Sequence, residues 1–207
     1  GSTTVPGPRN RNSPADIATS LAQLDPQQQV ETLNALTPYN AAKVLSNIDQ
    51  GQIDQLMSQP GLNPDLLGQL QQFITPESYA NLTKTWDADR IASSLKYPDL
   101  TPESRGKILE NTPQASGVFK GLIQDDPQAA MASFQNLTRA KQTEVLSQLD
   151  ADSLTSLLAT GENHTFFSLL STENKKTVLA NLSETDPALA RSYLYDNARP
   201  VANTDVS

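Results

Sequence analysis

The chain has 207 residues, a formal net charge of −8, a hydrophobic fraction of 37% and no cysteine. The lack of cysteine excludes disulfides, thiolate nucleophiles and cysteine-ligated metals. The acidic balance argues against a surface that binds nucleic-acid phosphates. No apolar run approaches the roughly 18 residues that a membrane-spanning helix needs, so we expect no direct insertion into a membrane.

We expect three parts along the chain: a flexible lead-in over residues 1–13, one elongated helical domain over residues 14–198, and a flexible tail over residues 199–207. The lead-in starts with Gly-Ser, which reads as a cloning scar, and continues with Pro, Gly and Arg without apolar periodicity. A scar at one end and an abrupt stop at the other suggest a piece excised from a longer protein, so the absence of a signal peptide is uninformative.

Nine of the 14 prolines directly follow Ser, Thr, Asp or Asn, and each of these pairs predicts the start of a helix. The short polar side chain accepts a hydrogen bond from a free amide of the first turn, and proline at the first helical position needs no donor. About a dozen helix-compatible residues follow each pair. The pairs are Ser13-Pro14, Asp25-Pro26, Thr37-Pro38, Asn63-Pro64, Thr75-Pro76, Thr101-Pro102, Thr112-Pro113, Asp126-Pro127 and Asp186-Pro187.

The pairs recur with a period of about 38 residues, which indicates an internal repeat. Pro26, Pro64 and Pro102 are spaced by 38 residues, and each ends a Leu-x-Pro triplet. Later triplets lack the proline and the spacing drifts. The predicted units cover residues 24–61, 62–99, 100–136 and 137–169, with a terminal piece over 170–199.

Apolar residues inside each unit recur at helical spacing, as at Val30, Leu33 and Leu36. Boundary residues about 12 apart divide a unit into three helices of roughly three turns each, too short to persist alone in water. The sequence shows no alternating strand pattern and no Asn-Gly hairpin turn. We therefore predict an all-α solenoid with three-helix repeats. Equivalent buried places are expected for Leu24, Leu62 and Leu100, and equivalent caps for Asp25, Asn63 and Thr101.

No catalytic, cofactor-binding or metal-binding residues are predicted. His164 is the sole histidine, so a multi-histidine metal site is impossible and a Ser-His-Asp triad could use only this base. It lies in a predicted loop and helix start, where an exposed or capping histidine is the simpler interpretation. The acidic pairs Asp125-Asp126 and Glu184 with Asp186 also lie at helix starts, where capping is favoured over metal binding.

A family resemblance is carried by the segment from Leu36 to Leu45, LTPYNAAKVL, which is preceded by Leu-Asp-Pro and followed by Ile-Asp. This segment resembles the N-terminal domain of the MgtE magnesium transporter and is similar to the right-handed superhelix of the flagellar motor switch protein FliG. The resemblance is clear over about residues 24–58. It implies a bacterial origin and an armadillo-like right-handed superhelix that serves as an assembly or regulatory platform. The chain lacks the dense carboxylates of the transporter domain and the charged helix of the motor protein, so no functional residues are carried over.

Three functions remain open. The first is a non-enzymatic scaffold for protein–protein interaction within a larger bacterial protein, such as a secretion, envelope or motor component or a delivered effector. The second is a divalent-ion-sensing regulatory domain, and the third is an enzyme with an unrecognised site. The lack of cysteine slightly favours an exported or extracytoplasmic location over a cytoplasmic one.

A protein partner is expected on the face lined by the third helix of each unit, and self-association is a further possibility. These third helices are predicted near residues 50–57, 88–95, 127–134 and 164–170. They carry or adjoin residue types that are enriched in interface anchors. The alternative interpretation is that the large apolar members are simply core residues. The candidate partner-binding residues are Met57, Trp86, Arg90, Phe134 and Phe166.

Overall fold

The computed structural model describes residues 13–198, and within this range all regular structure is helical. The predicted lead-in, apart from residue 13, and the predicted tail lie outside the described residues. The helices are α2 (Pro14–Leu21), α3 (Pro26–Ala35), α4 (Pro38–Leu45), α5 (Gln50–Met57), α6 (Pro64–Leu70), α7 (Pro76–Leu82), α8 (Ala88–Ser94), α9 (Pro102–Glu110), α10 (Ala115–Asp125), α11 (Pro127–Phe134), α12 (Arg139–Leu146), α13 (Ala151–Leu158), α14 (His164–Ser168), α15 (Thr172–Thr185) and α16 (Pro187–Ala198).

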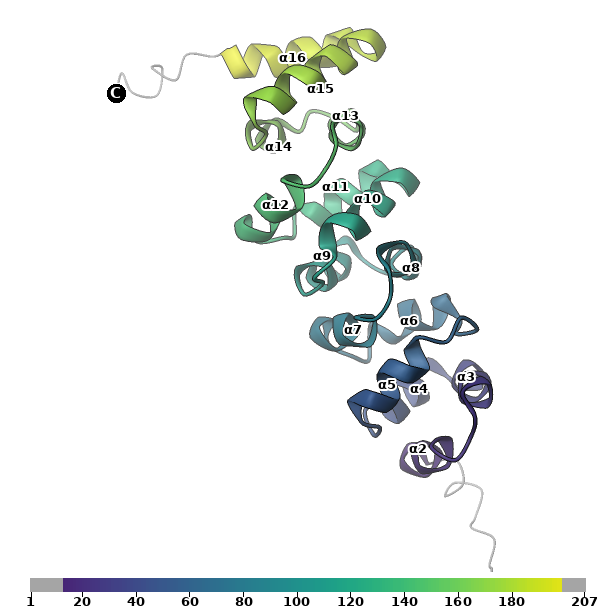
Figure 1. Ribbon diagram of the computed structural model, residues 1–207. Helices are drawn as coiled ribbons and strands as arrows, with labels where there is room; N and C mark the ends of the chain where they lie inside the picture. Colours follow the sequence, from purple (N-terminus) through teal and green to yellow (C-terminus); the bar gives the residue numbers. More distant parts are fainter. Residues whose placement is uncertain (1–12, 199–207) are drawn as a thin grey trace, which may run out of the picture.

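The helices stack into an elongated array that runs from α2 at one end to α15 and α16 at the other (Figure 1). Many of the closest backbone approaches join helices two apart in the chain, such as α2 with α4, α4 with α6, α6 with α8, and α8 with α10. A second series joins α3, α5, α7, α9, α11 and α13 in the same way. Each helix therefore buries its apolar stripe against near neighbours, and the predicted all-α helical-repeat superhelix is confirmed.

The spacing of the helix starts agrees with the predicted repeat. The first helix of each unit begins at residue 26, 64, 102, 139 or 172, so the intervals are 38, 38, 37 and 33 residues. Asp25, Asn63 and Thr101 each accept a hydrogen bond from a first-turn amide, as expected for N-caps. Leu62 and Leu100 are buried, whereas Leu24 is only half-buried because it lies near the end of the array.

One predicted helix start is wrong. Thr112-Pro113 does not open a helix, since α10 begins at Ala115 after a turn. The Thr112 side chain is buried, and its hydroxyl donates to the Ile108 carbonyl 2.7 Å away at the end of α9. Thr112 therefore completes the preceding helix. Ser13 also precedes a helix without making a side-chain cap bond, whereas Asp186 caps α16 through the Leu189 amide.

The core is one continuous, mainly aliphatic cluster from Ala18 to Tyr193. Between α8 and α10, small residues meet at close range. A Cβ atom built on Gly117 would lie 2.9 Å from the Ala88 Cβ, and one on Gly121 would lie 2.8 Å from the Ala92 Cβ. These separations leave no room for a methyl group, so glycine sets the distance between the two helices.

Side chains from one unit satisfy backbone groups of another. Trp86 Nε1 donates to the Met57 carbonyl, Gln114 Nε2 donates to the Trp86 carbonyl at 2.7 Å, and the Thr138 amide donates to the Glu110 carboxylate at 2.9 Å. The partners in these bonds are 28 or 29 residues apart. Short helices leave many unpaired carbonyls and amides at their ends, and these bonds satisfy them while they join the units.

Candidate interaction surface

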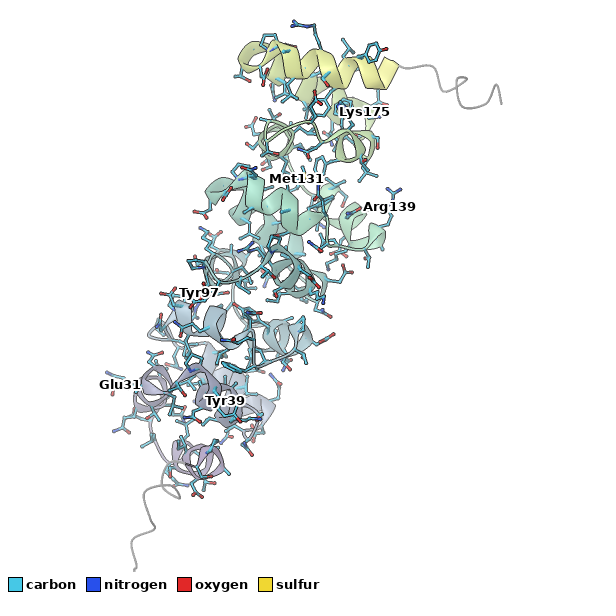
Figure 2. The ribbon with its side chains drawn as sticks, turned by 180° about the vertical axis from the view of Figure 1, so that it is seen from behind. Glu31, Tyr39, Tyr97, Met131, Arg139 and Lys175 are labelled. Atoms are coloured by element: carbon cyan, nitrogen blue, oxygen red, sulfur yellow. The ribbon has the colours of Figure 1, made fainter. Side chains whose placement is uncertain are left out.

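Two large aromatic side chains project from the middle of the N-terminal half of the array. Tyr39 is 51% exposed and Phe73 is 43% exposed, and their rings pack edge to face with centroids 5.5 Å apart. Lys43 places its Nζ 5.3 Å from the centroid of the Tyr39 ring. Figure 2 shows Tyr39 on the face seen from behind. We call Tyr39, Lys43, Phe73 and the neighbouring Ile74 the aromatic surface.

The repeat does not require aromatic residues at these positions. Tyr39 is the second residue of α4, and the second residues of α7, α10 and α13 are Glu77, Ser116 and Asp152. Phe73 lies three residues after the end of α6, and positions counted equally from the starts of α3, α9 and α12 hold Ala35, Asn111 and Gln148. Since other units fold with small or polar residues at these places, packing of the repeat does not explain the exposed pair.

Two cavities flank Ile74. One, of about 260 Å³, is lined by Ile48, Ile53 and Leu82 among others. The other, of about 190 Å³, is lined by Tyr79, Lys107 and Ile108 among others. Ile74 lines both cavities and follows Phe73 directly. Through Ile74 the aromatic surface therefore adjoins two partly apolar depressions, each large enough to accept one side chain of a partner.

The structure places four of the five residues proposed from sequence in the core. Met57, Trp86, Phe134 and Phe166 are buried, with 0, 2, 2 and 5% exposure, so the core interpretation describes these side chains. Arg90 is half-buried and reaches the surface.

Met57, Trp86 and Arg90 come together at the C-terminal end of α5. The Arg90 guanidinium lies 4.0 Å from the centroid of the Trp86 ring, and its Nη2 donates to the Gln59 carbonyl at 2.8 Å. Burial lowers the pKa of Arg90, and Asp87 partly opposes this effect. Arg90 thus binds the end of α5 and holds successive units together, which is a structural role seen in the contacts themselves.

Phe134 and Phe166 form a second group. Their ring centroids lie 4.9 Å apart, and Phe119 packs against Phe134 at 5.6 Å. This aromatic cluster joins α10, α11 and α14 within the core.

The expectation that the third helices line one face is wrong for α5 and α8. Among the closest backbone approaches, α5 contacts α3 and α7, whereas α8 contacts α6 and α10. In Figure 1, α5 and α8 lie on opposite sides of the array. The cause is the preference for contacts two helices apart, which places equivalent helices of adjacent three-helix units in different contact series.

His164 lies beside Glu162 and Ser192, but the geometry is not that of a catalytic triad. The Ser192 hydroxyl is 3.3 Å and the Glu162 carboxylate 3.9 Å from the same ring nitrogen, Nε2. A triad needs the nucleophile and the acid on opposite nitrogens of the ring. The Ser192 hydroxyl donates to Glu162 at 3.1 Å. The cluster therefore joins the start of α14 to α16.

Among residues 13–198, no three His, Asp or Glu side chains gather where they could hold a metal ion. None of the helices in that range combines the length and apolar character needed to cross a membrane.

Comparison with known proteins gives one family. Residues 12–112 match the model of the family described as the MgtE intracellular N domain, which confirms the resemblance over just under half of the chain. No curated protein and no solved structure gives a match. The matched segment ends with α9 and contains the whole aromatic surface. Fold and family together define a helical-repeat domain whose N-terminal half is similar to the MgtE N domain.

Sequence reasoning did not single out Tyr39 and Phe73. The sequence does carry a signal for them: both residues are aromatic, whereas equivalent positions in other units of the repeat are small or polar. A search for unit-specific aromatic residues at otherwise polar positions would have found both.

Proposed function

We propose that the chain is a non-enzymatic interaction domain of a larger bacterial protein and that it binds a protein segment at the aromatic surface. The exposed Tyr39–Phe73 pair carries this proposal, since its two rings are half-exposed, in contact with each other and unnecessary for the repeat. Aromatic residues beside small pockets are typical anchors of protein interfaces. A secretion, envelope or motor assembly, or delivery as an effector, would provide such a partner.

The proposed contact has a defined chemistry. The two rings offer apolar area at low conformational cost, the cavities beside Ile74 accept aliphatic side chains, and Lys43 adds a positive charge next to Tyr39. We therefore expect a partner segment with two apolar side chains and an adjacent carboxylate.

Site-specific crosslinking in the full-length parent protein tests the proposal. A photoreactive residue at position 39 should give one dominant protein adduct, and Phe73→Ser should reduce its yield at least several-fold while the melting temperature changes little. Tyr195→Ser is the matched control, because Tyr195 is 68% exposed and lies on α16, far along the chain. An adduct that persists in Phe73→Ser, or that is lost equally in Tyr195→Ser, contradicts the proposal.

A second candidate is divalent-cation sensing within a regulatory domain, and the match of residues 12–112 to the MgtE N domain favours it. A ligand that binds only the folded chain must raise its stability. If the domain senses Mg²⁺, millimolar Mg²⁺ at constant ionic strength should raise the melting temperature by several degrees. An unchanged melting temperature removes this candidate and leaves the interaction domain.

A further inference from the structure

A buried arginine lines a cavity elsewhere in the array. The cavity has a volume of about 360 Å³ and lies among α8, α9, α10 and α11. Arg105, 8% exposed, belongs to its lining, together with apolar Leu95 and Leu122. Charged Lys96, Asp125 and Asp126, all exposed to solvent, also line it. The cavity thus combines an apolar wall, a buried cation and charged groups of both signs at the surface.

The repeat does not need a charged residue at the position of Arg105. Arg105 is the fourth residue of α9, and its Nε and Nη2 donate to the Leu95 and Leu100 carbonyls at 2.8 and 3.3 Å. Gln29 and Gln142 are the fourth residues of α3 and α12, and their neutral amides donate to preceding carbonyls in the same manner. A glutamine therefore performs the structural task in two other units.

The positive charge of the Arg105 guanidinium is also only partly balanced by its hydrogen bonds. Its third bond is a weak one to the Ser133 hydroxyl at 3.5 Å, and no described carboxylate oxygen lies within 4.0 Å of it. A guanidinium has five N–H donors, and these bonds occupy three of them. Burial lowers the pKa of Arg105, while the more distant Asp126 and Asp125 oppose the effect. A buried cation without a contacting anion favours binding of one.

We infer that this cavity binds a small zwitterion, namely an α-amino acid with an aliphatic side chain. Its carboxylate would pair with Arg105, its ammonium group would face Asp125 and Asp126, and its side chain would pack against Leu95 and Leu122. The volume suits a ligand of this size, since it lies at the lower end of the range for small-molecule pockets. Because the lining offers Asp125 and Asp126 as well as Arg105, a ligand with both charges fits it better than a simple anion.

The test is an NMR titration of the full chain with L-leucine and its two halves. L-Leucine should cause saturable shifts at the amides of Leu95 and Ala130 and at Arg105 Nε–H. 4-Methylpentanoate, which lacks the ammonium group, and 3-methylbutylamine, which lacks the carboxylate, should each bind about tenfold more weakly or worse.

Two variants separate binding from folding. Arg105→Gln copies Gln29 and Gln142, so it should remain folded by circular dichroism and melting while leucine binding falls at least about tenfold. Lys107→Gln, which changes an exposed cation of the same helix, should bind leucine as the parent does. No saturable shifts with leucine, equal binding of 4-methylpentanoate, or unchanged binding in folded Arg105→Gln would each overturn the inference.

Discussion

At the residue scale, the buried leucine before each first helix should contribute more stability than the cap that follows it. Leu100 is 4% exposed, and its replacement by alanine should cost about 2 to 5 kcal/mol because a cavity remains. Thr101 accepts from the Ser104 amide at 3.0 Å, and Thr101→Ala should cost only about 1 kcal/mol. Urea unfolding monitored by circular dichroism measures both. Half-buried Leu24 provides the control, since Leu24→Ala should cost less than Leu100→Ala; equal costs for Leu100→Ala and Thr101→Ala would contradict the prediction.

Asp150 should make stability depend on acid pH. A hydrogen bond from Lys120, with help from Ser153, lowers the pKa of Asp150 from 3.8 to about 2. Because this pKa is lower in the folded chain than in the unfolded one, the stabilisation is present above about pH 4 and is lost as the pH falls toward 2.

Asp150→Asn keeps a competent N-cap but removes the charge. The variant should therefore be less stable than the parent at pH 5, and the difference should shrink steadily as the pH falls from 4 to 2. Urea midpoints from pH 2 to 6 measure it. A difference between parent and variant that is constant over this range is inconsistent with the ion pair to Lys120, whose Nζ lies 2.8 Å from the carboxylate.

The sequence predicts the helix caps well but does not predict the tertiary contacts. Asp25 and Thr101 were predictable because a cap bonds to amides only two or three residues away. The contact of Arg90 with Gln59 and the cavity of Arg105 were not, since both depend on helices that meet only after the array has stacked. Phe134 and Phe166 were candidates for partner binding from their residue type, with the core as the alternative, and both are buried because the stacked helices enclose them.

At the element scale, the contact between α8 and α10 should tolerate no added methyl group. Gly121→Ala places its Cβ 2.8 Å from the Ala92 Cβ, so the helices must separate, at a cost of about 1 to 3 kcal/mol from overpacking. Part of this cost is offset by the better helix propensity of alanine, about 1 kcal/mol.

A double-mutant cycle separates the two effects. Ala92→Gly makes room, so Gly121→Ala should be less destabilising, or even stabilising, in the Ala92→Gly background. Chemical unfolding of the four variants gives the coupling energy. A coupling energy near zero would show that the helices already have space for the methyl group.

The helix boundaries show the same division between local and distant causes. Helices opened by Asp25-Pro26 or Asp126-Pro127 begin where the local chemistry predicts. Thr112-Pro113 has the same local chemistry but ends a helix, because burial directs the Thr112 hydroxyl backward to Ile108. Tertiary burial overrode the local signal at this position.

At the scale of the whole molecule, stability should be highest in the middle of the array. Helices α8, α10 and α11 have neighbours on both sides, whereas α2 and α16 lie at the ends (Figure 1). In a linear array each unit depends on its neighbours, so the ends open first. Native-state hydrogen exchange should give opening free energies for amides of α10 that exceed those of α2 by at least about 1.4 kcal/mol, a factor of ten. Uniform exchange across the chain would mean that it opens as a single unit.

The hydrogen bonds between units have a consequence for synthesis on the ribosome. Met57, Trp86 and Glu110 each accept a hydrogen bond from a residue that lies 28 or 29 positions later in the chain. Domains fold as they emerge during translation, N-terminal part first. A newly made unit of this protein therefore lacks some of its hydrogen-bond partners until nearly one further unit has left the exit tunnel, and a pause in translation at a unit boundary would leave those groups of the last unit unpaired.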